Sequence, residues 1–127
     1  MISFIFVLLA SICNAIMDVT QFHFWRSIFN NDLFRARWWN GNVSWRNKYI
    51  NGDVKQGRTN TPVWFTDAFH FFKSSMIINL TLAIVLYDVM INPLIDFLIL
   101  GLTWNTFFNL FYRHLLKKQT YEQKKKR

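Results

Sequence analysis

The chain has 127 residues, of which 52% are hydrophobic, so its length fits one domain. Its formal net charge of +8 arises from 15 Lys and Arg residues against 7 Asp and Glu residues. These cationic residues flank apolar stretches and mix with tryptophans, which indicates contact with anionic lipid head groups and argues against nucleic acid as a partner. The only cysteine, Cys13, excludes an internal disulfide and a thiol metal motif.

Three apolar stretches predict membrane-spanning helices, because each is near the roughly 20 residues that cross a hydrocarbon core. They cover residues 2–25, 68–91 and 94–112. Helices of this length leave no room for a separate soluble catalytic domain. We therefore expect an all-α membrane protein in which residues 1–127 form a single membrane domain. Any chemistry must then take place at the membrane.

Residues 26–67 are expected to form an aromatic, basic loop between the first and second spans, lying on the membrane surface. Five of the six tryptophans occupy or border it: Trp25, Trp38, Trp39, Trp45 and Trp64. Indole rings favour the boundary between head groups and water, so Trp38, Trp39 and Trp45 are expected to be partly buried. A short interfacial helix is predicted near residues 28–38, followed by short extended pieces separated by turns.

The distribution of cationic residues predicts the orientation in the membrane. Seven lie in the loop and seven in the basic tail 113–127, whereas the connector between the second and third spans carries two acids and no base. Because positive residues are enriched on the cytoplasmic side, the loop and the carboxyl terminus are expected inside. The amino terminus and Asn92 are expected outside. Membrane lipids with anionic head groups are the expected partners.

Ionisable side chains at the cytoplasmic ends of the spans are the candidates for a functional site. Helical periodicity places Asp67 and His70 on one face of the second span, with Lys73 one turn further on. Asp18 lies roughly 10 Å deeper in the first span, at 1.5 Å per residue. A charged group there costs about 2.5 to 3.5 kcal/mol on insertion scales. We therefore expect Asp18 and His70 to contact each other and at least one of Asp67, Lys73 and His23.

Two interpretations of these residues are open. In the first, Asp18, His23, His70 and His114 supply the nitrogen and oxygen ligands that one divalent metal such as zinc or iron accepts. In the second, Asp18 pairs with His70 or Lys73 as a structural contact between helices, and the remaining histidines are merely hydrated at the interface.

The loop also contains donors suited to a phosphate group. The candidate phosphate-binding residues are Ser44, Arg46, Asn47, Lys48 and Lys73. The candidate catalytic residues are Asp18, Asp67 and His70. Together they would suit hydrolysis or group transfer on a lipid head group, with His70 as general base or metal ligand and Asp67 orienting it. Alternatively, Arg46 or Lys48 pairs with an acid and only fixes the loop to the helices.

Two motifs are specific enough to suggest relatives. Residues 44–49 read Ser-Trp-Arg-Asn-Lys-Tyr, and residues 67–70 read Asp-Ala-Phe-His. Across about residues 14–75 the chain resembles a set of small bacterial membrane proteins that have no assigned activity. The resemblance implies a bacterial inner-membrane location. It also implies that the Asp, His and Lys candidates belong with the tryptophan loop as one unit.

Two classes of function remain open from the sequence. The first is a membrane-embedded enzyme that acts at the cytoplasmic leaflet on a phosphorylated lipid or amphiphile. The second is a non-catalytic membrane subunit or homo-oligomer, for which Asn105 and Asn109 would suit an interface between helices. An ion or proton path is a weaker third, because three helices enclose too little volume for a pore without oligomerising.

Overall fold

The computed structural model describes residues 2–30, 33–59 and 62–118. Within these residues, three helices are long and apolar enough to cross a membrane, and no β-strand is formed. They are α1 (Ile2–Phe22), α4 (Ala68–Val85) and α5 (Pro93–Asn109), the last continued by the π-helical η5 (Leu110–Leu115). The predicted all-α fold with three spans is confirmed.

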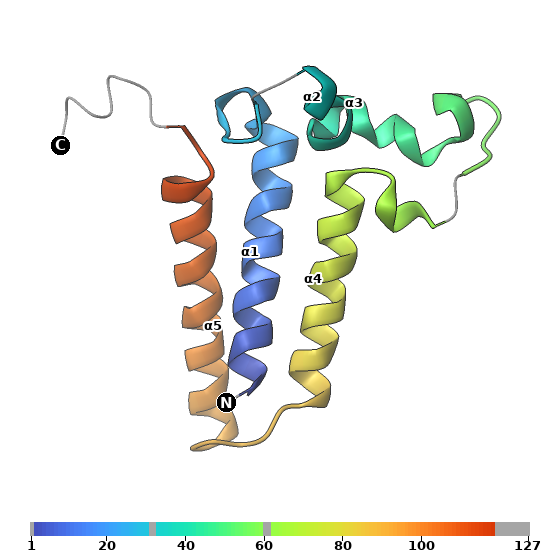
Figure 1. Cartoon of the computed structure of the whole chain (residues 1–127). Helices are drawn as coiled ribbons and strands as arrows, with labels where there is room; N and C mark the ends of the chain where they lie inside the picture. The colour runs from blue at the N-terminus through green and yellow to red at the C-terminus, as the bar shows by residue number, and fades with distance from the viewer. Residues whose placement is uncertain (1, 31–32, 60–61, 119–127) are drawn as a thin grey trace, which may run out of the picture.

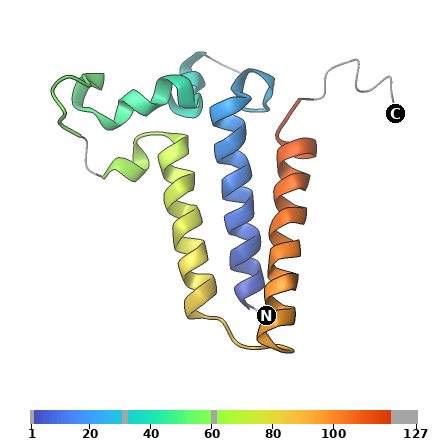
Figure 2. The ribbon, with the colours of Figure 1, turned by 180° about the vertical axis from the view of Figure 1, so that it is seen from behind.

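Helix α1 lies between α4 and α5 and contacts both (Figures 1 and 2). It therefore has two buried sides, and most of its buried residues are small: Ser3, Ala10, Ser11, Cys13, Ala15 and Thr20. Small side chains allow helices to approach closely within a membrane. The hydroxyl groups of Ser11 and Thr20 donate hydrogen bonds to carbonyls of their own helix, so their burial leaves no donor unpaired.

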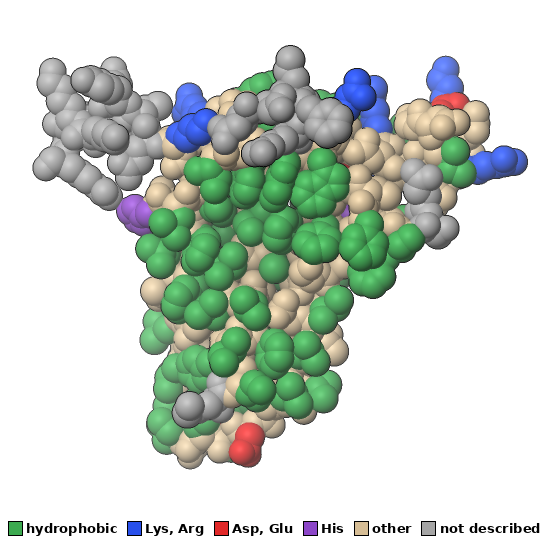
Figure 3. Space-filling view, viewed as in Figure 1, with side chains coloured by type: hydrophobic (Ala, Val, Ile, Leu, Met, Phe, Trp, Pro, Cys, Tyr) green, Lys and Arg blue, Asp and Glu red, His purple; other side chains and the backbone are tan. Residues whose placement is uncertain are grey.

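The outer helices expose large apolar side chains, as a lipid-facing surface requires. Ile84 on α4 keeps 77% of its surface exposed, and Leu102 on α5 keeps 67%. Figure 3 shows hydrophobic side chains over the helices and Lys and Arg side chains gathered at the end that carries the loop. An apolar band bounded by charge at one end is the pattern expected of a chain embedded in lipid.

Helix α4 ends at Val85, whereas the sequence predicted a span to residue 91. The buried carboxylate of Asp96 explains the earlier end. It accepts hydrogen bonds from the backbone N–H groups of Met90 and Ile91, at 2.8 and 3.2 Å, and from the hydroxyl of Tyr87 at 3.0 Å. Asp96 thus supplies partners to two backbone N–H groups of the connector that a continued helix would otherwise pair.

Helix α5 begins where the sequence supplies strong start signals. The side chain of Asn92 accepts a hydrogen bond from the backbone of Ile95 at 2.9 Å, and Pro93 occupies the first turn. The hydroxyl of Ser3 donates to the carbonyl of Leu86 at 3.0 Å, which ties the start of α1 to the end of α4. The α4–α5 connector therefore also anchors the first span.

At the opposite end, α1 stops at Phe22 instead of residue 25, and a series of short helical turns follows. These are η1 (Phe24–Arg26), α2 (Leu33–Trp39), α3 (Gly41–Ser44), η2 (Trp45–Lys48), η3 (Ile50–Gly52) and η4 (Val63–Phe65). The prediction of short extended pieces in this loop is therefore wrong. The one extended feature among its described residues is an isolated bridge between Tyr49 and Thr59. Asn40 caps α3 by accepting from the backbone of Asn42, which favours a helical turn there.

The segment after η5 returns to the end of α1. The carbonyl of Leu116 accepts from the backbone of Ile28 at 3.0 Å, and Ser27 and Lys117 form an isolated bridge. The first and third spans are thus joined beyond the membrane as well as within it. The predicted basic tail, residues 113–127, includes the basic run at 124–127. That run lies outside the described residues.

Candidate functional site

Asp67 begins α4 and carries the best-defined polar contacts at the loop end of the molecule. Its side chain is fully buried and takes the helix-capping position: Oδ1 accepts a hydrogen bond from the backbone N–H of His70 at 3.0 Å. Oδ2 lies 2.6 Å from Nδ1 of His70 and 3.3 Å from the hydroxyl oxygen of Thr66, which also lies 2.7 Å from the carbonyl oxygen of Val63. Among the described residues this is the one ion-pair contact within 4.0 Å.

The contact with Asp67 sets the protonation pattern of His70. A carboxylate oxygen only accepts hydrogen bonds, so Nδ1 carries the proton and donates it. In the neutral ring, Nε2 is then the basic nitrogen. Nε2 makes no hydrogen bond to another residue in the described part of the chain. An imidazole held in this way by a buried carboxylate is suited to general-base catalysis.

His70 lines a cavity of about 740 Å³ between α1, α4 and the short helices of the loop. Its polar lining residues are Asp18, Gln21, Asn42, Lys48, Asp67, His70 and Lys73. Its apolar lining includes Met17, Phe22, Trp45 and Phe69. This volume lies within the range of roughly 300 to 1,000 Å³ that is usual for small-molecule sites. The lining is more polar than is usual for such sites, because most of its residues carry charged or hydrogen-bonding side chains.

Asp18 and His70 share this cavity but do not bond to each other. The sequence predicted mutual contact, yet no hydrogen bond or ion pair joins these two described side chains. His70 instead pairs with Asp67 on its own helix, because the capping position brings that carboxylate within reach. The predicted polar cluster is therefore arranged around a hollow, with Asp18 facing it from α1.

The cationic side of the cavity comes from Lys48 and Lys73. Lys48 belongs to η2, and its amine lies 5.1 Å from the centre of the Tyr49 ring. Lys73 is exposed, one helical turn beyond His70 on α4. These two of the five candidate phosphate-binding residues thus line the same cavity as the candidate base.

The other three candidate phosphate-binding residues lie outside the cavity lining. Asn47 donates from Nδ2 to the carbonyls of Arg37 and Thr66, at 2.7 and 3.1 Å, and thereby connects α2 to η4. Arg46 is exposed, with its guanidinium 5.5 Å from the Trp45 ring centre. The hydroxyl of Ser44 is buried and has no hydrogen-bond partner among the described residues. Neighbours in the sequence thus point to different surroundings, because successive residues of a helical turn project in different directions.

The four candidate metal ligands are not brought together. No group of three His, Cys, Asp or Glu side chains in the described ranges is placed to hold a metal ion. His114 is exposed on η5 and lines a different hollow with Asn105 and Asn109. Nε2 of His23 lies 2.8 Å from the hydroxyl of Tyr112 and bonds to it. The predicted zinc or iron site is therefore not formed by these residues.

The surroundings of His23 favour its neutral form. Burial lowers the pKa of His23, and the nearby positive charges of Lys117 and Arg26 lower it further, while Asp18 opposes them. The amine of Lys117 lies 3.6 Å from the centre of the Tyr112 ring, so one tyrosine contacts both side chains. His23 thus joins the first span to the third at the edge of the membrane.

Gly41 allows the loop to approach α1 closely beside the cavity. A methyl group at this position would lie 3.2 Å from Cα of Gln21 and would clash with the Gln21 side-chain oxygen. Without a side chain, the start of α3 can approach α1 closely enough for Asn42 to line the cavity. The lack of a side chain at Gly41 therefore permits the close approach of α3 to α1.

Aromatic contacts fix the loop to the beginning of α4. Trp39 stacks on Phe29 with ring centres 4.1 Å apart and lies 5.9 Å from Phe72, while Trp38 lies 6.2 Å from Phe71. Both indoles are half-buried, as predicted. Trp45 keeps 38% of its surface exposed beside the cavity. The loop is thereby held against the helices by side-chain packing.

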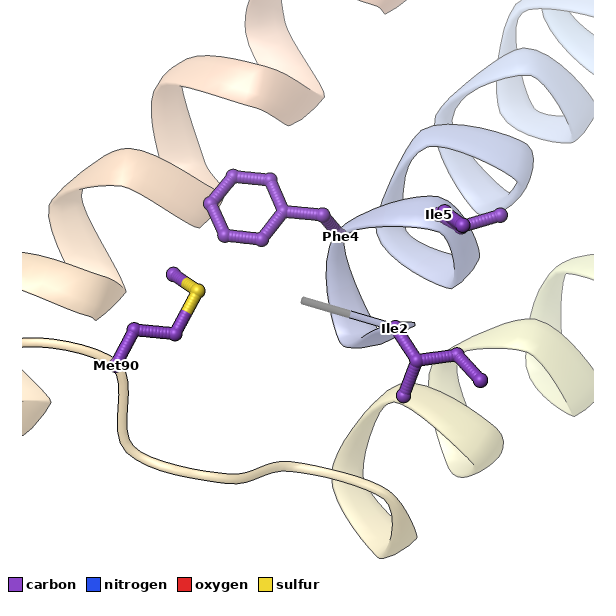
Figure 4. Close-up of a pocket in the computed structure, with 4 residues that line it drawn as sticks. All are labelled: Ile2, Phe4, Ile5 and Met90. Carbon is purple, nitrogen blue, oxygen red and sulfur yellow. The ribbon is translucent and has the colours of Figure 1, made fainter.

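A second hollow lies at the other end of the molecule. Ile2, Phe4, Ile5 and Met90 line a cavity of about 540 Å³ (Figure 4). These side chains offer no acid, base or nucleophile, so this cavity is not a candidate active site.

Several residues of the site were not predicted from the sequence. Gln21 and Asn42 line the cavity, and Gly41 permits the close approach of α3 to α1. In the sequence, Asn40-Gly41 is typical of a turn, but a turn signal does not predict which segment the turn will approach. Nothing in the sequence pointed to Tyr112 as the partner of His23, because these residues are far apart in the chain.

Comparisons with known proteins add no family: no protein-family model, no curated protein and no solved structure matches the chain.

Proposed function

We propose that this chain is a membrane-interface enzyme that uses His70 as a general base on an amphiphile with a phosphorylated head group. One observation carries the proposal: buried Asp67 holds Nδ1 of His70 at 2.6 Å, and His70 lines a cavity that also contains two lysines. When Nε2 takes a proton from water or a hydroxyl group, the carboxylate stabilises the resulting imidazolium.

The lining of the cavity supports an amphiphilic substrate. Lys48 and Lys73 provide ammonium groups that attract a phosphate, and Phe22 and Phe69 provide apolar surface for the adjoining chain. In this proposal Asp18, the other carboxylate of the lining, orients the attacking water or hydroxyl group. The reaction class that fits is hydrolysis or group transfer at the head group.

We further propose that the cavity opens at the cytoplasmic leaflet of a bacterial inner membrane. The support is the gathering of Lys and Arg side chains at the end of the molecule that carries the loop (Figure 3), together with the positive-inside bias. The bacterial location rests on the resemblance of residues 14–75 alone. An Asn92→Cys variant in a Cys13→Ser background should be labelled from outside the intact cell, and labelling only after permeabilisation would contradict this orientation.

The enzymatic proposal is tested by lipid conversion. The purified chain is placed in bilayers of phosphatidic acid, phosphatidylglycerol and phosphatidylcholine in equal parts, and each lipid and its products are quantified by mass spectrometry. We expect loss of an anionic lipid, slowed about 10²-fold or more by His70→Gln. His114→Gln, at a histidine outside the cavity, should retain the wild-type rate. A wild-type chain that converts none of the lipids, or a fully active His70→Gln variant, would contradict the proposal.

The second candidate is a non-catalytic membrane subunit in which the same residues are structural. The observation in its favour is that Oδ1 of Asp67 caps α4, so the Asp67–His70 contact also stabilises the start of a helix. In this case the capping would matter and the protonation of His70 would not. The Asp67→Asn substitution distinguishes the enzyme from the non-catalytic subunit, because asparagine can still cap the helix but changes the contact with the His70 ring.

A further inference from the structure

The outward face of α5 presents polar groups within the span. Asn105 is exposed and Asn109 is half-buried. Each Nδ2 donates to the backbone carbonyl four residues earlier, at 3.0 Å to Gly101 and at 2.8 Å to Asn105. Neither Oδ1 accepts a hydrogen bond from a residue that the structure describes. Acyl chains cannot supply the missing donor, so these acceptors are unsatisfied in a single copy surrounded by lipid.

This face is turned away from the rest of the chain. At 100° per residue, Asn105 and Asn109 share a face with Leu98 and Leu102, which keep 57% and 67% of their surfaces exposed. Helix α1 lies along the other side of α5, and no other described helix lies beside it (Figures 1 and 2). The described part of the chain therefore does not cover these amides.

Gly101 makes a close approach possible on the same face. It is exposed, and a methyl group added there would meet no atom within 4 Å, so packing inside the chain does not require a glycine. Glycine in the middle of a helix is less favourable than alanine. Its four-residue spacing from Asn105 places it one turn away, where a small residue lets a second helix backbone come near.

We propose that α5 helices from two copies of this chain pack together across this face, with Gly101 near the closest approach and the asparagines bonding between copies. A carboxamide both donates and accepts, so the same polar face on a second copy is complementary to it. A lipid head group would explain Arg113 and His114 at the charged end of the helix. It does not explain Asn105, which lies roughly 12 Å deeper at 1.5 Å per residue.

The association is tested by energy transfer between labelled copies in phosphatidylcholine vesicles over a range of dilution. Asn105→Leu should raise the dissociation constant of the dimer at least tenfold. Asn79→Leu is the matched control, because Asn79 donates to the carbonyl of Ser75 four residues earlier, at 2.8 Å, but belongs to α4. A wild-type chain that is monomeric at every dilution, or equal effects of the two substitutions, would overturn the proposal.

Cross-linking gives a second readout that needs no disruptive substitution. In a Cys13→Ser background, Leu102→Cys should cross-link to its copy, because Leu102 lies beside Asn105 on the outward face. Ile77→Cys, at an exposed position in the middle of α4, should not. Equal cross-linking at both positions would indicate random collision and would count against a specific α5 interface.

Discussion

Asp67 and His70 share two contacts: Oδ1 of Asp67 accepts the backbone N–H of His70 at 3.0 Å, and Oδ2 lies 2.6 Å from Nδ1 of its ring. The first contact begins α4 and the second orients the imidazole. One buried carboxylate therefore combines a structural role with a chemical one. A substitution that keeps one contact and changes the other can separate them.

Asp67→Asn is expected to preserve the fold and remove activity. Asparagine caps helices about as well as aspartate, so stability should change by less than about 1 kcal/mol. Its amide nitrogen, placed where Oδ2 lies, would donate to Nδ1 and shift the ring proton to Nε2. Thermal unfolding and lipid conversion are measured together, and conversion should fall by about 10² to 10⁴-fold. Unchanged conversion would show that His70 needs no carboxylate.

The sequence predicted the parts of the site that depend on local spacing. The spacing of three residues between Asp67 and His70 predicted that both side chains lie on one helix face, and in the structure they bond to each other. The three spans were likewise predicted from hydropathy, because in lipid every backbone group must be satisfied inside a helix. Local rules were sufficient in both cases.

Contacts between segments that are distant in the sequence could not be predicted from local spacing or hydropathy. Asp18 was expected to bond to His70, but the loop and two helices leave a cavity between them that periodicity alone cannot reveal. The end of α4 was misplaced because Asp96, from the next helix, satisfies the N–H groups of Met90 and Ile91. In each case the deciding interaction comes from tertiary packing.

Gly41→Ala is expected to push α3 away from α1, because the new methyl group would lie 3.2 Å from Cα of Gln21 and closer to its side-chain oxygen. Forcing a methyl group into a close contact costs about 1 to 3 kcal/mol. Gly57→Ala is not a matched control, because Gly57 has a positive φ of 64°. The suitable control is Gly101→Ala, where the methyl group meets nothing.

Chemical denaturation in detergent, in which the chain is diluted to a monomer, measures the effect. Gly41→Ala should lower the free energy of unfolding, and Gly101→Ala should not lower it, since alanine favours the helix. Equal stability of the Gly41→Ala variant and the wild type would show that α3 does not depend on this close approach.

His23 is expected to titrate below its ordinary pKa of 6.5, because burial and the charges of Lys117 and Arg26 disfavour its cationic form. Well above pH 6.5 the ring is neutral in both the folded and unfolded states. As the pH falls below 6.5, the unfolded chain binds the proton first, so stability is lost progressively down to the lowered folded pKa.

Nuclear magnetic resonance of labelled histidine, with His114→Gln to simplify the spectrum, follows this titration. Lys117→Gln should raise the pKa of His23 towards 6.5, since it removes the larger of the two cationic contributions. A His23 that titrates above 6.5 in the wild-type chain would contradict the proposed electrostatic surroundings.

Asp96→Ala is expected to loosen the connector between α4 and α5. The substitution removes the acceptor for Met90, Ile91 and the hydroxyl of Tyr87, leaving three donors unsatisfied. Hydrogen exchange of residues 86–92 should accelerate at least tenfold, while exchange at the Asp67 end of α4 stays at the wild-type rate. Uniform acceleration along the whole chain would instead indicate global destabilisation.

Rescue of His70→Ala by free imidazole tests the proposed role of His70 most directly. Lipid conversion is measured for this variant in the same mixed bilayers, with increasing imidazole and with a second series containing His114→Ala. The cavity of about 740 Å³ has room for the added base. We predict that His70→Ala loses conversion and regains part of it in proportion to imidazole, while His114→Ala is active without it. Full activity of His70→Ala without imidazole would contradict a general-base role for His70.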